Sequence, residues 1–454
     1  MDYKKLTFAT VLAMGASMIY AQTAEIATWS GFRKAAVSFT FDDGPQSDVD
    51  VALPMFEKYG YKATFNIVTN WANGGGNNGM LNWSGVQKLS AAGHEIASHS
   101  DSHPNGRPMP ANEISSSKGT ISQKIQQKYG VVTLAYPNCD TPGDAQVLQN
   151  YVVGRICNGS WKGGSDIMGK DGPSNWAAVS ALMTGNQGTS DFKGNMDKAV
   201  QQGGWVAFLT HGFQNKTNGF ADYSPTDANG MDGALQYAQQ KDKDIWVAPM
   251  GYVAMYIKER KASKIESQDG GSANSMAFEL KHSIADNISK YDYPLSIKVK
   301  TDWSKVEVTQ DGAKLESKVD GGYVYFDAVP NAGKIVVTNA NATPEPEPSS
   351  SSDNTEISSS SDVGCDALIP GCGYEGPGME IAPSIQNNFH LAVYRSSDNY
   401  IVVSGAQGLN ITVFNSLGHQ VRTTRGLGVE QKVYTGAKGI YIVKVGGKTM
   451  KVRL

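Results

Sequence analysis

The stretch AAVSFTFDDGP, residues 35–45, is an apolar segment that ends abruptly in two acidic residues and a Gly-Pro turn. Its β-branched and aromatic residues predict a strand, and the turn residues predict where that strand stops. Strand-like and helix-like segments then alternate along the chain, at 49–58, 62–68, 83–92, 94–98, 113–129, 205–210, 232–240, 244–249 and 252–260. Such alternation predicts an α/β domain built on a mainly parallel sheet or barrel.

Length and charge limit the classes of protein that remain. The chain has 454 residues, with 40 Lys and Arg against 43 Asp and Glu, which leaves a formal net charge of −3. At roughly 150 residues per domain we expect about three domains, so the chain is too long to be a single small domain. The near-neutral balance removes the electrostatic reason to expect nucleic acid or an anionic membrane as a partner.

The first 21 residues have the order of a secretory signal peptide. Lys4 and Lys5 precede an apolar run, and small residues lead up to Ala21. A buried N-terminal helix is the alternative. No other apolar run reaches the roughly 20 residues that a membrane span needs. We therefore expect no membrane span and a protein that is secreted or displayed at the cell surface, where disulfides are permitted.

Three further segments follow the α/β region. Polar and apolar residues alternate over 275–340, which predicts an accessory β-sandwich. Residues 343–362, rich in Ser and Pro, have almost nothing apolar to bury and predict a disordered linker. Short alternating segments then predict a C-terminal β-domain over 363–454.

Paired carboxylates mark the end of the first predicted strand. In parallel sheets and barrels the C-terminal strand ends carry the ligand site. Asp42 and Asp43 stand at such an end, and two neighbouring acids repel each other unless a positive charge is close. The alternative is a simple turn, because Asp, Gly and Pro are turn formers.

Two histidines four residues apart, His99 and His103, follow another predicted strand. On a helical turn, side chains at i and i+4 face one way and can chelate one cation. Asp43 would complete a three-ligand site with positions left open, as catalytic zinc sites require. Solvated surface histidines are the alternative. His211 ends the strand over 205–210 and could protonate a leaving group, although a single strand-end histidine carries little information.

Three motifs together resemble the polysaccharide deacetylase family, carbohydrate esterase family four. They are TFDDGP at 40–45, HSxxH at 99–103 and LTHG at 209–212, in matching order and spacing. The resemblance covers about residues 30–260 and implies an irregular (β/α) barrel as the catalytic domain, for which we predict the bounds 25–265.

The resemblance also implies roles for five residues. Asp42 would be the general base, Asp43, His99 and His103 the metal ligands, and His211 the general acid. The cofactor would be a divalent metal, most often zinc, with cobalt or another transition metal as alternatives.

The chain departs from the family where members often have Arg-Pro-Pro-Tyr-Gly, because residues 135–139 read AYPNC. The arginine that steadies the base is therefore missing, and we expect Arg155 to replace it or to be structural. By position, the backbone N–H of Asn138 would stabilise the oxyanion and Tyr136 would line the substrate groove. No clear Asp-Trp motif follows, so Trp161 is only a candidate for the groove wall.

The four cysteines fall into two pairs, Cys139 with Cys157 and Cys365 with Cys372. Disulfides are the favoured interpretation, because no histidine that could activate a thiol is close in sequence. The C-terminal segments 408–422 and 439–454 resemble the sorting domains of the type IX secretion pathway, with a generic β-module as the alternative. That resemblance predicts secretion or surface-attachment machinery as a partner.

We therefore expect a secreted, metal-dependent deacetylase whose substrate is an acetylated polysaccharide, with acetylxylan favoured over chitin or peptidoglycan. The alternative from another class is a carbohydrate-binding protein that has lost catalysis.

Overall fold

The computed structural model describes residues 24–105, 109–139, 144–162, 165–185, 187–268, 271–286, 288–342 and parts of 392–453. It separates into one unit at residues 1–350 and a second at 351–454. The predicted signal peptide and linker lie outside the described residues, as does the predicted pair Cys365 and Cys372.

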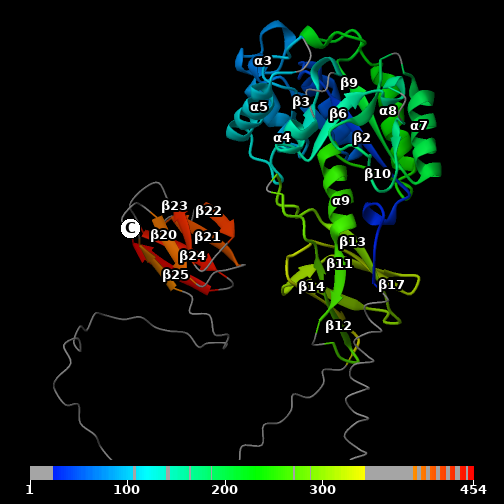
Figure 1. Cartoon of the computed structure of the whole chain (residues 1–454). Coiled ribbons are helices and arrows are strands. Elements are labelled where there is room, and N and C mark those ends of the chain that lie inside the picture. The colour runs from blue at the N-terminus through cyan, green and yellow to red at the C-terminus, as the bar shows by residue number, and fades with distance from the viewer. Residues whose placement is uncertain are drawn as a thin grey trace, which may run out of the picture. The chain divides into compact units, whose positions relative to one another are not determined.

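The first unit contains a closed barrel of seven parallel strands (Figure 1). The chain of neighbours runs β2, β3, β4, β5, β6, β8, β9 and back to β2. Two short strands extend it, β10 parallel to β2 and β7 antiparallel to β9. The bounds are β2 (Ala35–Phe41), β3 (Thr64–Ile67), β4 (Glu95–Ser98), β5 (Thr133–Ala135), β6 (Val153–Cys157), β7 (Ile167–Met168), β8 (Val179–Met183), β9 (Trp205–Thr210) and β10 (Ile245–Val247). The predicted α/β barrel is confirmed.

Helices connect the strands and cover the outside of the barrel. They are α2 (Leu53–Tyr59), α3 (Thr69–Asn73), α4 (Trp83–Ala91), α5 (Ala111–Lys124), α6 (Asp144–Leu148), α7 (Thr189–Gln202), α8 (Ala228–Gln240) and α9 (Met250–Ala262). The expected helix over 113–129 ends early, at Lys124. The side chain of Gln127 accepts a hydrogen bond from the Ile96 N–H at 3.0 Å and donates one to the Ile96 carbonyl at 2.7 Å. These bonds to β4 keep the chain extended where the helix was expected to continue.

Strand β2 shows how the sequence places its acidic end. Successive side chains of a strand point to opposite faces. Phe39 and Phe41 pack in the core beneath the helices, whereas Ser38 and Thr40 donate hydrogen bonds to the carbonyls of Ala248 and Phe208, both at 2.8 Å. The next residue in the inward series is Asp42, so the alternation delivers its carboxylate to the barrel's end.

Helix α9 closes the other end of the barrel. Its first backbone N–H groups, which no helical carbonyl can satisfy, donate to side chains of the barrel strands. Met250 N–H bonds the Thr64 hydroxyl at 2.8 Å, and Gly251 N–H bonds Glu95 at 3.0 Å. Glu95 is fully buried and also accepts from Thr64 and Thr133. Among the described residues, α9 therefore covers the end of the barrel opposite to Asp42.

Two antiparallel sheets make the accessory β-domain, in the orders β1-β13-β17-β16 and β11-β12-β18-β14-β15. The bounds are β1 (Ala24–Ile26), β11 (Lys264–Ser267), β12 (Ser275–Lys281), β13 (Leu295–Lys300), β14 (Val306–Gln310), β15 (Ala313–Leu315), β16 (Ser317–Asp320), β17 (Tyr323–Ala328) and β18 (Lys334–Asn339). Strands β1 and β11 lie outside the predicted span 275–340. That the barrel and the accessory β-domain are separate domains stays a prediction.

Helix α9 also packs on the accessory sheets, so the barrel and the β-domain share a core. Buried residues of α9, of the barrel and of both sheets belong to one continuous hydrophobic cluster. Two hydrogen bonds fix the junction, from the Tyr256 hydroxyl to the Ala27 carbonyl at 2.9 Å and from Tyr293 N–H to Glu259 at 3.1 Å.

The second unit is antiparallel. Its strands are β19 (Ala392–Arg395), β20 (Tyr400–Ser404), β21 (Asn410–Asn415), β22 (Gln420–Arg425), β23 (Glu430–Tyr434), β24 (Ile440–Val445) and β25 (Lys448–Arg453). Alternate residues such as Ile411, Val413 and Val443 form its core. The sorting role stays a prediction. In the part of the chain that the structure describes, every helix is too short or too polar to span a membrane.

Candidate active site

Asp42 sits at the carboxyl end of β2 and is almost completely buried, with 2% of its surface exposed. The side-chain amide of Asn66 on β3 donates to its Oδ1 at 2.9 Å, and the Arg155 guanidinium binds both carboxylate oxygens. Burial opposes ionisation, but Arg155, His99 and His211 outweigh it and hold the pKa of Asp42 well below its usual range. Asp42 is therefore an anion at neutral pH.

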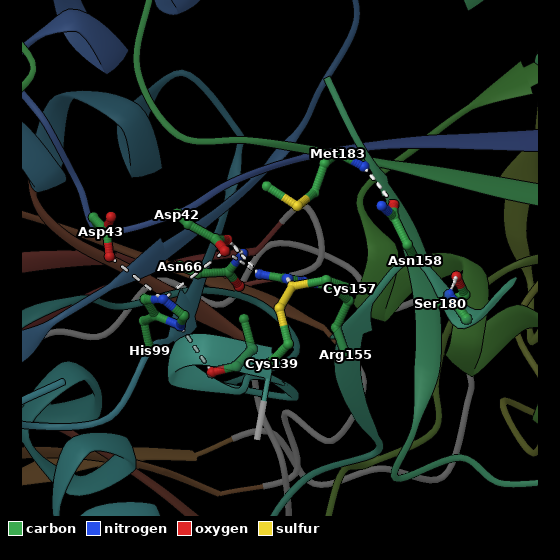
Figure 2. Close-up of a disulfide and its surroundings, with 12 residues drawn as sticks. Asp42, Asp43, Asn66, His99, Cys139, Arg155, Cys157, Asn158, Ser180 and Met183 are labelled. Carbon is green, nitrogen blue, oxygen red and sulfur yellow. Dashed lines mark hydrogen bonds and ion pairs between the residues drawn. A yellow bond between two sulfur atoms is a disulfide. The ribbon is translucent and has the colours of Figure 1, made fainter. Parts of the chain in front are cut away.

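Arg155 comes from β6 and is fully buried. The structure places its guanidinium on Asp42, where the sequence predicted a substitute for the missing motif arginine (Figure 2). A buried carboxylate needs a partner of opposite charge, and one guanidinium nitrogen of Arg155 contacts both oxygens of Asp42. The placement agrees with the prediction, while the catalytic role of Arg155 stays a prediction.

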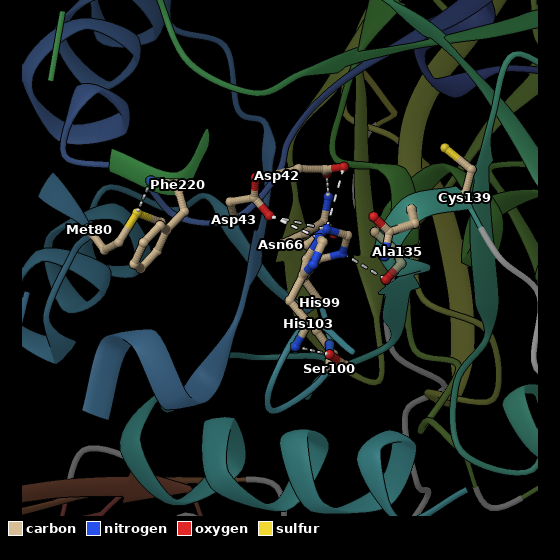
Figure 3. A network of polar contacts seen from close by, with 12 residues as sticks. Asp42, Asp43, Asn66, Met80, His99, Ser100, His103, Ala135, Cys139 and Phe220 are labelled. Carbon is tan, nitrogen blue, oxygen red and sulfur yellow. Dashed lines mark hydrogen bonds and ion pairs between the residues drawn. The ribbon is translucent and has the colours of Figure 1, made fainter. Parts of the chain in front are cut away.

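Asp43, His99 and His103 converge on one point (Figure 3). The Asp43 Oδ1 lies 3.4 Å from the Nε2 of His99 and 3.6 Å from the Nε2 of His103. One ligand atom from each of the three residues lies within 4.8 Å of the others. Among the described residues, no group donates a hydrogen bond to this buried Asp43 oxygen. The set is a carboxylate and two imidazoles, which suits zinc and similar divalent cations.

The expected helical turn between the histidines is wrong. Ser100 and His103 have positive φ angles of 67° and 52°, so the segment after β4 is an irregular loop. The Ser100 hydroxyl accepts a hydrogen bond from the His103 N–H at 3.0 Å, which folds the loop back. Asp43 also has a positive φ, 74°. Such conformations are unfavourable for these residue types and cluster at functional sites.

The tautomer of His99 is fixed by its surroundings. Its Nδ1 lies 2.8 Å from the carbonyl oxygen of Ala135 on β5, and a carbonyl can only accept, so Nδ1 carries the proton. In the neutral ring Nε2 then presents its lone pair toward Asp43. A hydrogen bond from the second ring nitrogen to a carbonyl is the usual arrangement for a metal-binding histidine.

His211 follows β9 and lines the same pocket as the carboxylates. Burial lowers its pKa, and Asp42 and Asp43 oppose that shift only in part. The Tyr223 ring packs edge-on against its imidazole, with 5.5 Å between the ring centroids. The position suits proton transfer to a group bound in the pocket.

The segment that replaces the arginine motif forms another wall. Tyr136 is buried and Asn138 is exposed, and both line the pocket. Asn138 has a positive φ of 54°, and its side-chain amide donates to the Pro104 carbonyl at 3.2 Å. Trp161 belongs to a short 3₁₀ helix (Gly159–Lys162), but its side chain lies outside the described part of the chain.

A disulfide joins Cys139 to Cys157, as predicted (Figure 2). Cys139 directly follows Asn138, and Cys157 stands two residues after Arg155. Both cysteines line the pocket. The bond therefore ties the Asn138 loop to the strand that carries Arg155.

Three aromatic residues that the sequence reasoning missed stand at the mouth of this pocket, whose volume is about 620 Å³. Trp71 stacks on His103 at 5.3 Å between centroids and lies 4.9 Å from Phe220. Phe220 and Tyr223 are 55% and 67% exposed, although large aromatic residues are usually buried. Phe220 and Tyr223 follow β9 and His211 in the chain, and that position was the one signal for these two residues. Trp71 lies on α3 and had no such signal.

A third buried carboxyl, Asp48, also escaped the sequence reasoning. Burial and the charges of Asp43 and Asp42 raise its pKa well above the usual value. Neither of its oxygens has a hydrogen-bond partner among the described residues. Its surroundings therefore favour the neutral form of this carboxyl over the charged one.

Part of the barrel matches a known protein family. The family model for polysaccharide deacetylases matches residues 30–151, which include Asp42, Asp43, His99 and His103. The matched residues run from β2 to β5 and stop before β6, so the match covers part of the barrel and less than half of the chain. This part of the chain is similar to a family of hydrolases of the carbohydrate esterase class.

Individual relatives match parts of this chain. A gellan lyase from Bacillus sp. is 24% identical over 336 residues, or 69% of this chain and 13% of that protein. A bifunctional xylanase/deacetylase from Pseudobutyrivibrio xylanivorans is 35% identical over 95 residues, or 21% of this chain and 15% of that protein. The chain therefore matches only a small part of each of these relatives.

Two solved structures align over about half of this chain. The Xyl-CE4 domain of a multidomain xylanase from the hindgut metagenome of Trinervitermes trinervoides is 18% identical, with a TM-score of 0.31, and covers 47% of this chain and 87% of that one. A peptidoglycan deacetylase from Bacillus subtilis is 16% identical, with a TM-score of 0.31, and covers 50% and 93%.

Proposed function

We propose that this protein is a metal-dependent deacetylase that hydrolyses acetyl groups on a carbohydrate polymer, with acetylxylan as the favoured substrate. The observation that carries the proposal is one pocket whose lining includes Asp42, Asp43, His99 and His103. Arg155 lies buried behind Asp42 and pairs with its carboxylate. A base and a three-ligand cation site side by side are the parts that hydrolysis of an ester or amide requires.

The cation site fits a divalent metal, with zinc as the favoured ion. Asp43 offers an oxygen without a hydrogen-bond donor, and His99 offers an Nε2 whose lone pair is fixed by the Ala135 carbonyl. Three protein ligands leave positions for water and substrate, whereas a structural zinc site uses four. When bound, such a cation makes water more acidic and polarises a carbonyl group, which suits a base as weak as Asp42.

Asp42 is the group that takes the proton from the attacking water. Its low pKa keeps it ionised at neutral pH, and Arg155 and Asn66 hold the carboxylate in one orientation. A base fixed in this way loses little entropy in the transition state. Replacing Asp42 by Asn removes the base, while Asp43 and the two histidines remain as ligands.

Asn138 acts on the carbonyl oxygen of the acetyl group, and His211 acts on the sugar atom that leaves. As the water oxygen bonds to the acetyl carbon, the carbonyl oxygen becomes negative, and the backbone N–H of Asn138 stabilises it. The bond from that carbon to the sugar oxygen or nitrogen then breaks, and protonated His211 gives its proton to the leaving atom. Acetate leaves, Asp42 releases the proton that it took from the water, and His211 takes up a proton again, so both groups return to their starting state.

The alternative of a binding protein that has lost catalysis rested on the missing motif arginine. The contact between Arg155 and Asp42 removes that argument, because the base has a guanidinium partner after all. Hydrolysis is therefore the better proposal for this pocket.

The choice of polymer rests on chain architecture and on similarity. An accessory β-domain joined to the barrel suits an enzyme that attacks insoluble fibre, and one relative is named a bifunctional xylanase/deacetylase. The same architecture supports export to the medium or the cell surface, with the C-terminal unit for sorting or attachment. Chitin and peptidoglycan are the alternative substrates.

Acetate release tests the proposal. The full chain is incubated with acetylxylan, chitin oligomers and peptidoglycan, with chelator and after zinc is added back. We expect release that is largest on acetylxylan, that stops with chelator and that returns with zinc. Asp42→Asn should abolish turnover but still bind zinc in equilibrium dialysis, and full activity of that variant would refute the assignment of the base.

A further inference from the structure

The outward face of one accessory sheet carries a row of aromatic residues. In β17 the side chains of Val324 and Phe326 are buried in the domain core, so Tyr323 and Tyr325 point away from it and are half-exposed. The neighbouring strand β16 pairs Lys318 with Tyr325 and Asp320 with Tyr323. Residues paired across strands share a face, so charged groups border the rings.

A third ring is added by the segment that leads into the barrel. Phe32 ends a 3₁₀ turn (Ser30–Phe32) and packs edge-on against Tyr325, with 5.3 Å between centroids and an angle of 85°. Its φ of 58° is unfavourable for a bulky residue. The strain persists because Gly31 N–H donates to the Ser296 hydroxyl at 2.8 Å, and that hydroxyl donates to Asp327. The fold thus holds Phe32 in place at some energetic cost.

The charges on this face are already paired with each other. Lys298 forms an ion pair with Glu25 at 2.8 Å and lies over the rings of Phe32 and Tyr323 at 5.1 and 5.3 Å. Lys318 pairs with Asp320 at 2.9 Å. The face therefore has no excess of cations that would attract a polyanion.

Phe32, Tyr325, Lys318 and Asp320 line a pocket of about 520 Å³ that shares no lining residue with the catalytic pocket. Phe32 and Tyr325 form its apolar wall, and the carboxylates of Glu316 and Asp327 stand around it. A pyranose ring has an apolar C–H face and a rim of hydroxyl donors, so it matches a flat aromatic ring bordered by carboxylate acceptors.

We propose that this pocket binds a neutral polysaccharide chain by ring stacking on Phe32 and Tyr325. The binding needs neither an acetyl group nor the catalytic residues, and so it stands apart from the deacetylase reaction. Holding the polymer on the accessory domain raises the local concentration of substrate at the barrel of the same molecule.

The test is depletion of the full-length protein from solution by insoluble, unacetylated xylan and cellulose. We compare the wild type with a double variant, Phe32→Asn with Tyr325→Thr. Asn tolerates a positive φ and Thr suits a strand, so the variant keeps the fold, which its thermal transition verifies. We expect at least tenfold weaker binding by the variant, with unchanged acetate release from a small soluble acetyl ester.

Tyr237→Ala is the matched control, because Tyr237 on α8 is also half-exposed and also has a lysine, Lys193, 4.7 Å over its ring. It should bind as the wild type does. Equal binding by the wild type and the double variant, or no binding to either neutral polymer, would overturn the proposal. Binding to polygalacturonate alone would also overturn it. A third contrary outcome is a wild-type dimer in sedimentation that becomes a monomer in the double variant.

Discussion

Arg155 and Asp42, which are 113 residues apart in sequence, meet as a buried ion pair in which one guanidinium nitrogen contacts both carboxylate oxygens. The pair joins β6 to the end of β2, and it explains how an anion can exist in a site with almost no contact with solvent.

Arg155→Met should raise the pKa of Asp42, because the burial that opposes ionisation is then no longer balanced by the nearest cation. The base would be protonated at a higher pH, so the acidic limb of the kcat/KM profile should move to higher pH. We expect kcat at neutral pH to fall by about 100-fold, within the usual range for general base catalysis. Arg155→Lys, which keeps the charge, should restore the acidic limb in part. An unchanged pH profile in Arg155→Met would contradict this role.

Reduction of the disulfide between Cys139 and Cys157 should lower kcat more than it changes KM. The bond holds the loop of Asn138 against the strand of Arg155, so its loss loosens both the oxyanion donor and the partner of the base. We expect kcat of the double variant Cys139→Ser with Cys157→Ser to fall about tenfold, or about 1.4 kcal/mol. For a sequence separation of 18 residues the loss of stability should be about 3 kcal/mol.

The matched control for that experiment is Cys365→Ser with Cys372→Ser, which removes the other predicted pair and should leave kcat unchanged. If both double variants lose the same activity, the effect is general and the positioning role is wrong.

The exposed aromatic rim should determine how well polymer binds to the catalytic pocket. Tyr223→Ala and Phe220→Ala remove rings that stand beside His211 and Trp71. We expect KM for a soluble acetylated xylan to rise several-fold in each variant, while kcat/KM for a small acetyl ester changes little. An equal loss on both substrates would show instead that the rings shape the catalytic centre.

Glu259 should make the fold less stable as pH rises. Burial raises its pKa to about 8, and the Tyr293 N–H opposes that shift only in part. Between its unfolded value near 4.5 and 8, the folded state holds a proton that the unfolded state has lost, so unfolding becomes easier with pH. The slope is at most about 1.4 kcal/mol per pH unit. Glu259→Gln should flatten the dependence of Tm on pH across this window, and an identical slope in both proteins would count against it.

The alternation of strand-like and helix-like segments predicted the barrel, although β5, β6 and β8 were not among the predicted strands. Asp42, Asp43, His99 and His211 could be placed at strand ends by that pattern alone, and parallel strands bring such ends together. The loop geometry of Ser100 and His103 could not be predicted, because nothing in their residue types indicates a positive φ. The role of Gln127 in ending α5 depends on contacts with β4, which lie far from it in sequence.

Contacts between distant segments also explain the other omissions. The pairing of Arg155 with Asp42 followed from analogy and not from any local signal. The aromatic residues at the pocket mouth lie in connecting segments without a pattern, and β1 joins a sheet whose other strands are almost 300 residues away. Local patterns carry no information about such partners.

The pairing of β1 with β13 makes the barrel an insertion within the accessory domain. From β1 in that domain, the chain passes through the whole barrel and returns by way of α9. The two parts are joined by two covalent crossings and not by a single hinge. In evolution, a barrel of this kind can be exchanged only if both junctions are cut and rejoined together, so its history is tied to that of the β-domain beside it.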